Sequence, residues 1–193
     1  MPPTREAEGL LLKIVVIGRG NVGGGLARLW QRAGHDVVSL GREGGNASDA
    51  DVVVVAVPGD AIPEALSKVT GLPGKTTIDA TNSFSGPNDG FPSLAAEVKS
   101  IVGGATAKSF NTNFASLYDQ IAVQRNRPSN VFAADADARD VTEQLIRDAG
   151  FEPVYAGDLD NARTLEDHIV YTMMLARSEI GPHFYRLAPP GEL

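Results

Sequence analysis

A glycine-rich turn near the start of the chain constrains the fold more than any other feature. The turn, Gly18-Arg19-Gly20-Asn21-Val22-Gly23, directly follows residues 10–17, a run rich in Val and Ile. Such a run is typical of a strand that is buried on both faces. From residue 21 the apolar positions take the spacing of one helix face, and Gly34 ends that segment. The chain therefore begins with a strand, a tight turn and a helix.

The same alternation of strands and helices continues along the chain. Further strands are predicted at residues 36–40, 51–57, 76–80, 106–110 and 130–134, and helices at residues 21–33, 60–69, 138–149 and 159–177. Asp60 and Asp137 are predicted to cap two of these helices. The alternation indicates the α/β class, as a Rossmann-like doubly wound parallel sheet with the last helix as a small C-terminal extension.

The connection between the second and third predicted strands is unusually short. Residues 41–50 leave no room for the helix, outer strand and return connection that such a fold usually has there. Ten extended residues still span roughly 33 Å, enough to pass the first strand. We therefore expect a shortened second-to-third strand connection with neither helix nor strand, and we place strand 36–40 at the edge of the sheet.

The glycine turn predicts a site for a dinucleotide diphosphate. Gly18 permits the tight turn, Gly20 lets a phosphate approach the backbone, and Gly23 lets the helix lie close to the sheet. The N–H groups at the start of the helix, around Asn21 and Val22, face the bound anion. A glycine turn without a ligand is the alternative interpretation.

The end of the second predicted strand favours NADP(H) over NAD(H). An NAD site places Asp or Glu there to bind the ribose hydroxyls. This chain has Ser39-Leu40-Gly41-Arg42 instead, and a guanidinium can bind a 2′-phosphate. Glu43 comes one residue too late and is expected to point elsewhere. The alternative is that Arg42 is an ordinary surface arginine.

Residues at the ends of later strands complete the predicted site. Val57 and Pro58 end the third strand, where small residues leave room for the nicotinamide ribose. Asn82 and Asn111 end two further strands and can hydrogen-bond a ribose or a carboxamide. Both asparagines can equally serve only to form turns.

Several segments resemble one family, the NADPH-dependent reductases of the deazaflavin coenzyme F-420. These segments include KIVVIGRGNVGGGLARLWQRAGHDVV, DVVVVAVP, GKTTIDATN, AKSFNT and GFEPVYAGDLDNARTLE. The resemblance covers about residues 11–177 and implies that Arg19, Gly20, Asn21 and Val22 form the phosphate-binding turn. It places Gly41 and Arg42 where the family has a Ser-Arg pair for the 2′-phosphate, and Ala115 along the nicotinamide. The short 41–50 connection and Gly59 depart from the family pattern.

Composition excludes several other classes of protein. Seventeen Lys and Arg residues against 24 Asp and Glu residues give a net charge of −7, which argues against nucleic-acid binding. The chain has no cysteine and only three separated histidines, so no metal site is predicted. No run approaches the ~20 apolar residues of a membrane span, and no secretory signal is recognisable, so a cytoplasmic location is expected. Residues 1–9 and 188–193 are expected to be loose tails around a single domain, residues 10–187.

The glycine turn and Arg42 predict an NADP(H)-dependent oxidoreductase, and the family resemblance implies that its acceptor is a deazaflavin (coenzyme F-420 itself) or a flavin. No catalytic residue is assigned, because hydride transfer between two bound cofactors needs positioning rather than a protein nucleophile. The alternative is a catalytically silent NADP(H) sensor or regulatory module. A homodimer is expected, with the last helix at its interface.

Overall fold

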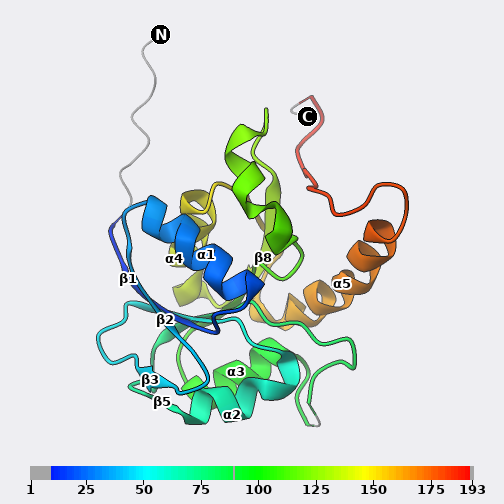
Figure 1. The fold of residues 1–193 in the computed structure, drawn as a ribbon. Coiled ribbons are helices and arrows are strands. Elements are labelled where there is room, and N and C mark those ends of the chain that lie inside the picture. The colour runs from blue at the N-terminus through cyan, green and yellow to red at the C-terminus, as the bar shows by residue number, and fades with distance from the viewer. Residues whose placement is uncertain (1–9, 89, 192–193) are drawn as a thin grey trace.

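Seven strands form one sheet in the computed structural model, which describes residues 10–88 and 90–191 (Figure 1). In spatial order they are β2 (Asp36–Leu40), β1 (Lys13–Ile17), β4 (Val52–Val55), β6 (Thr76–Asp79), β7 (Thr106–Lys108), β8 (Ser129–Ala134) and β9 (Glu152–Tyr155). The first five are parallel, β8 runs antiparallel to β7, and β9 is parallel to β8. The predicted α/β class and Rossmann-like doubly wound sheet are confirmed; the sheet is mostly parallel, and β8 is the strand that departs from this.

Helices cover both faces of the sheet, as a doubly wound fold requires (Figure 1). One face carries α1 (Asn21–Arg32), α4 (Ala136–Asp148) and the 3₁₀ segment η2 (Ala115–Val123); the other carries α2 (Ile62–Ser67) and α3 (Leu94–Val102). A short 3₁₀ turn, η1 (Gly59–Ala61), precedes α2, and another, η3 (Leu159–Asn161), precedes α5 (Ala162–Ala176). Helix α5 packs against α3 and the β7–β8 side of the sheet.

β4 is apolar at every position, and β1 at every position after Lys13, because the two faces of these strands lie in different cores. In β1, Ile14 and Val16 pack with the α1–α4 layer, whereas Val15 and Ile17 pack with the α2–α3 layer. Trp30 of α1 is fully buried in the first core and donates a 2.8 Å hydrogen bond to the Leu145 carbonyl of α4. This bond satisfies the indole N–H, the only polar group that burying the ring removes from water.

The short connection after β2 contains a strand, contrary to our expectation. β3 (Gly45–Asn46) pairs in parallel with β5 (Val69–Thr70) in a separate two-stranded sheet. Ala47, directly after β3, donates its N–H to the Thr70 carbonyl at 2.8 Å. The backbone of this connection therefore has hydrogen-bond partners in β5. The described connection contains no helix, and β2 lies at the sheet edge, as predicted.

Some elements and caps were not foreseen. The sequence interpretation omitted α3, β9 and η2. The predicted caps were also wrong: Asp60 lies within η1, and Asp135 rather than Asp137 occupies the N-cap position of α4. The Asp135 carboxylate accepts from the Thr106 N–H at 2.8 Å instead of capping the helix, so it joins the start of α4 to β7.

The two ends of the chain differ in what the structure describes. The expected tail at residues 1–9 lies outside the described residues. Near the other end, Ser129 of β8 donates its N–H to the Tyr185 carbonyl at 2.9 Å and accepts from the Leu187 N–H at 2.8 Å. The chain is therefore attached to the sheet up to residue 187, while the division of the chain there remains a prediction. Within residues 10–88 and 90–191, no helix is long and apolar enough to cross a membrane.

Candidate functional site

A cleft of about 750 Å³ lies at the carboxyl ends of β1, β2 and β4. The glycine turn forms one wall and α2 forms another, and the turn after β2 closes one end. The residues that line the cleft include Gly18, Arg19, Gly20, Gly41, Arg42, Glu43, Val57, Pro58, Glu64 and Lys68. Open α/β sheets bind ligands at this edge, where neighbouring connections leave to opposite faces.

Two glycines of the turn, Gly18 and Gly23, have the structural roles that the motif predicts. Gly18 has φ +115°, and a Cβ there would overlap the carbonyl oxygen of Ala56. A Cβ on Gly23 would overlap the Gly18 carbonyl oxygen, so only glycine lets α1 start this close to the sheet. Gly20 differs, because a Cβ there would meet nothing within 4 Å. Its backbone therefore borders open space in the cleft.

The N-terminus of α1 presents hydrogen-bond donors to this space. Gly20 is the N-cap residue, no side chain caps the helix, and the first turn contains no acidic residue. The first N–H groups of a helix have no partner within the helix. Together with the positive end of the helix dipole, they make the turn suited to an anion.

A β-turn after β2 places two charged side chains at the other end of the cleft. Gly44 donates its N–H to the Gly41 carbonyl at 3.1 Å, so Arg42 and Glu43 occupy the two central positions of the turn. Arg42 is exposed and makes no hydrogen bond or ion pair with any residue that the structure describes. Its guanidinium is therefore free to contact a ligand.

Glu43 points into the cleft, which corrects the expectation that it points elsewhere. Its carboxylate lies 2.8 Å from Nη1 of Arg19, and Arg19 also donates to the Ser39 carbonyl from Nε at 3.1 Å and Nη2 at 2.9 Å. A hydrogen bond from its own backbone N–H, supported by the Arg19 charge, lowers the pKa of Glu43. The carboxylate is thus an anion at neutral pH.

Helix α2 contributes a second ion pair to the cleft. Lys68 lies 2.6 Å from Glu64, one helical turn away, and the hydrogen bond from Lys68 lowers the pKa of Glu64. Arg42 lowers the same pKa further through its charge. The polar end of the cleft therefore holds three cations and two carboxylates, with Arg42 as the cation that lacks an ion pair.

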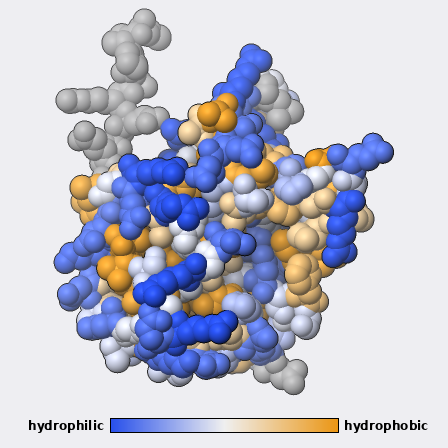
Figure 2. Space-filling view, in the orientation of Figure 1, coloured by the Kyte–Doolittle hydropathy of each residue, from blue (hydrophilic) through white to orange (hydrophobic). Residues whose placement is uncertain are grey.

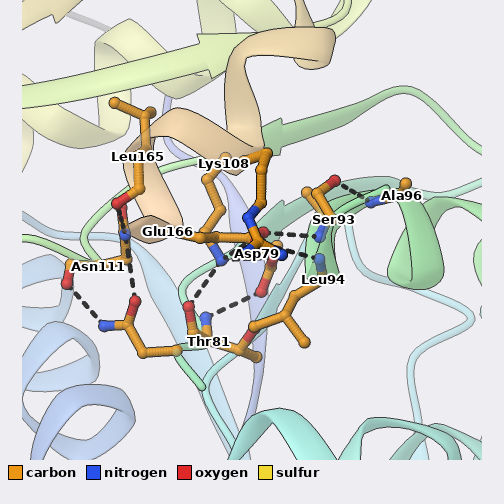
Figure 3. Close-up of polar contacts among 12 residues, drawn as sticks. Asp79, Thr81, Ser93, Leu94, Ala96, Lys108, Asn111, Leu165 and Glu166 are labelled. Atoms are coloured by element: carbon orange, nitrogen blue, oxygen red, sulfur yellow. Dashed lines mark hydrogen bonds and ion pairs between the residues drawn. The ribbon is translucent and has the colours of Figure 1, made fainter. Parts of the chain in front are cut away.

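The two predicted asparagines lie together, beyond the residues that line the cleft. Asn82 donates to the Asn111 carbonyl at 2.7 Å, and Asn111 donates to Oδ1 of Asn82 at 3.2 Å and to the Leu165 carbonyl at 2.8 Å. Figure 3 shows Asn111 reaching Leu165 of α5. The Asn111 Oδ1 atom is buried and has no partner among the described residues. These amides join the ends of β6 and β7 to α5.

Ala115 begins η2, which packs along α1. The Tyr118 ring of η2 lies over Gly25, where a Cβ would approach it to 2.6 Å. Tyr118 is 2% exposed, and burial raises the pKa of its hydroxyl. Gly25, which follows the predicted motif, is therefore needed for the contact between α1 and η2.

A buried ionic cluster at the ends of β6 and β7 was missed by the sequence interpretation (Figure 3). Lys108 of β7 has no exposed side-chain surface; its Nζ lies 2.8 Å from Asp79, 3.3 Å from Glu166, and 2.6 Å from the Thr81 carbonyl. Glu166 also accepts from the N–H groups of Leu94 and Ala95, at the start of α3. The cluster therefore joins β6, β7, α3 and α5 in one place.

The fold and the place of the cleft define a Rossmann-type domain, and solved structures with the same fold include reductases and dehydrogenases. No model of a known family matches the chain, and no curated protein matches it in sequence. One similar structure is a protein from Arthrobacter sp. FB24 that is described as an F-420-dependent NADP reductase. The two structures have a TM-score of 0.80 and 22% sequence identity, and the match covers 92% of this chain and 100% of the other.

Two other neighbours are more distant. The hypothetical protein SMa0349 from Sinorhizobium meliloti has a TM-score of 0.63 and 23% identity, over 80% of this chain and 88% of that one. A reductive aminase from Aspergillus terreus, solved with NADPH and ethyl levulinate, has a TM-score of 0.62 and 14% identity, over 86% of this chain and 62% of that one. At these identities the likeness establishes the Rossmann fold.

Replacing Lys108 by Met should destabilise the protein by about 3–5 kcal/mol, because it leaves Asp79 and Glu166 buried beside each other without their cation. Urea denaturation measures the change. Lys99→Met is the matched control: its ion pair with Asp135 at 2.7 Å is half exposed and should contribute no more than about 1 kcal/mol. Equal losses in the two variants would contradict a structural role for the cluster.

Proposed function

We propose that this protein is an NADP(H)-dependent oxidoreductase that transfers hydride between the nicotinamide and a deazaflavin or flavin-type acceptor. The observation that carries the proposal is one cleft that combines an uncapped helix N-terminus at a glycine turn with an arginine that lacks an ion pair. These groups suit the two anionic parts of NADPH, its diphosphate and its 2′-phosphate.

The diphosphate fits the glycine turn. The backbone of Gly20 borders open space, so a phosphate can approach the turn at this position and accept from the N–H groups of Asn21, Val22 and Gly23. Gly18 and the backbone of Arg19 complete the turn. At the other end of the cleft, Arg42 would bind the 2′-phosphate, with the backbone of Gly41 beside it.

The nicotinamide end is assigned to Val57 and Pro58, which line the cleft beyond the diphosphate site. Asn82, Asn111 and Ala115 are proposed to border the nicotinamide further along the same edge of the sheet. NADPH supplies the hydride when it is bound. The protein's part is to hold donor and acceptor ~3–3.5 Å apart and to exclude water.

The choice of a deazaflavin or flavin acceptor has two supports. One is the sequence resemblance to reductases of coenzyme F-420, which extends over most of the chain. The other is the Arthrobacter neighbour, described as an F-420-dependent NADP reductase, whose whole length this chain covers.

A silent NADP(H) sensor is the second candidate, and one observation favours it. The Asn111 amide donates both of its hydrogens, one to Asn82 and one to Leu165 of α5, so this amide has no N–H left for an acceptor. A chain that binds NADPH without donating hydride needs no polar group there.

A homodimer through α5 is part of the proposal. Val170, Tyr171 and Met174 lie on its outer face and are 62%, 53% and 58% exposed, and Figure 2 shows apolar side chains along this helix. Exposed apolar faces of this kind mark interaction surfaces. Light scattering should give twice the chain mass, and a monomer at micromolar concentration would refute the dimer.

Anaerobic turnover separates the enzyme from the sensor. The protein is mixed with NADPH and, one at a time, F-420, FMN and FAD, while the absorbance of NADPH is followed. We expect oxidation of NADPH with at least one acceptor. NADPH binding without oxidation by any of the three would favour the sensor.

Arg42→Ala should weaken the binding of NADPH about tenfold and leave the binding of NADH nearly unchanged, because only NADPH has the 2′-phosphate that Arg42 would bind. The size is at the lower end for a charge-assisted bond, since Arg42 is exposed. Titration calorimetry measures the dissociation constants of both cofactors. Raising the salt concentration from ~0.05 to ~0.5 M should weaken NADPH binding more than NADH binding. Arg28→Ala, on α1 outside the cleft, is the control; equal losses for both cofactors at Arg42 would refute the assignment.

Gly20→Val should abolish NADPH binding while the fold survives. The added side chain would project into open space and fill the volume proposed for the diphosphate. Gly20 has φ −72°, which valine adopts without strain. Melting temperatures with and without NADPH test both halves of the prediction: unchanged NADPH binding would show that the diphosphate lies elsewhere, and a large loss of stability without NADPH would contradict the assigned open space.

A further inference from the structure

The ion pair between Arg19 and Glu43 covers the place where a 2′-phosphate would approach Gly41. A Cβ on Gly41 would lie 2.5 Å from Oε2 of Glu43 and 2.9 Å from Nη1 of Arg19. The two charged groups therefore sit directly over the Gly41 α-carbon. A side chain larger than hydrogen at position 41 would have to displace them.

Arg19 is already occupied in this arrangement. Its Nε and Nη2 atoms donate to the Ser39 carbonyl at the sheet edge, and its Nη1 atom faces Glu43. Its positive charge is thus compensated by a carboxylate before any ligand binds. Arg42, on the adjacent turn position, carries no such partner among the described residues.

Glu43 has opposite effects on the two cofactors. A 2′-phosphate at this corner would meet a like charge, and it would compete with the carboxylate for Arg19. A free 2′-hydroxyl could instead donate a hydrogen bond to the carboxylate, which is the role that acidic residues play at this edge in NAD sites. The same side chain therefore disfavours NADPH and favours NADH.

We infer that Glu43 is a specificity-determining residue that holds Arg19 away from the 2′-phosphate and so narrows the preference for NADPH that Arg42 creates. The inference rests on the proposed function, since it concerns the same cleft. We therefore expect the cleft to bind both NADPH and NADH, with only a small preference for NADPH.

Glu43→Gln tests the inference by removing the charge and keeping the shape of the side chain. The ratio of the NADH to the NADPH dissociation constant, from titration calorimetry at low salt, should rise about fivefold, the upper range for exposed charges in contact. Glu143→Gln is the matched control: Glu143 on α4 is also ion-paired, to Arg139 at 3.1 Å, and its loss changes the net charge equally. An unchanged ratio in Glu43→Gln, or an equal rise in the control, overturns the inference.

A second arm tests whether Arg19 is the group that Glu43 withholds. Arg19→Met should change NADPH affinity little in the natural background but weaken it about fivefold in the Glu43→Gln background. Equal effects in both backgrounds overturn the inference. A natural chain that binds neither cofactor overturns the proposed function and this inference with it, whereas binding of both with an unchanged ratio in Glu43→Gln overturns the inference alone.

Discussion

The contact between the glycine turn and β4 is the constraint on which the cleft depends. Gly18 and Gly23 leave no room for a Cβ, because one backbone faces the Ala56 carbonyl and the other faces the Gly18 carbonyl. This approach lets α1 start at the very end of β1 and direct its first N–H groups into the cleft. A side chain at either position would move the helix away from the sheet and its donors away from any ligand.

The buried ionic cluster around Lys108 is a second constraint, and it acts at the ends of β6 and β7. Lys108 and Asp79 are direct partners in the β6–β7 register, and Glu166 reaches them from α5. Glu166 also receives the first N–H groups of α3, so one carboxylate compensates a buried cation and a helix terminus together. Burying these charges is favourable only because each has a partner. The cluster positions α3 and α5, whereas the glycine turn positions α1.

Patterns in the sequence were sufficient to locate the central strands along the chain, the glycine turn and the edge position of β2. A continuous apolar strand, a glycine motif and a helical stripe are each read from neighbouring residues. The β3–β5 sheet was missed because two strands of two residues carry no periodicity. The Lys108 cluster was missed because its members are up to 87 positions apart in sequence, although charged residues at the ends of two apolar strands were an available signal.

The orientation of Glu43 shows why spacing alone did not describe the polar corner. The sequence interpretation counted Glu43 as one residue beyond the position of an acidic ribose ligand, assuming that the chain continues extended. The chain instead turns at once, since Gly44 donates to Gly41. Gly45 then donates to the Lys68 carbonyl, and pairing with β5 fixes the segment that follows.

With β2 on one side of residues 41–43 and this small sheet on the other, the turn has little freedom. Both of its central side chains therefore line the cleft, one as a cation and the other as an anion. The shortened connection thus brings Arg42 and Glu43 to the same end of the cleft.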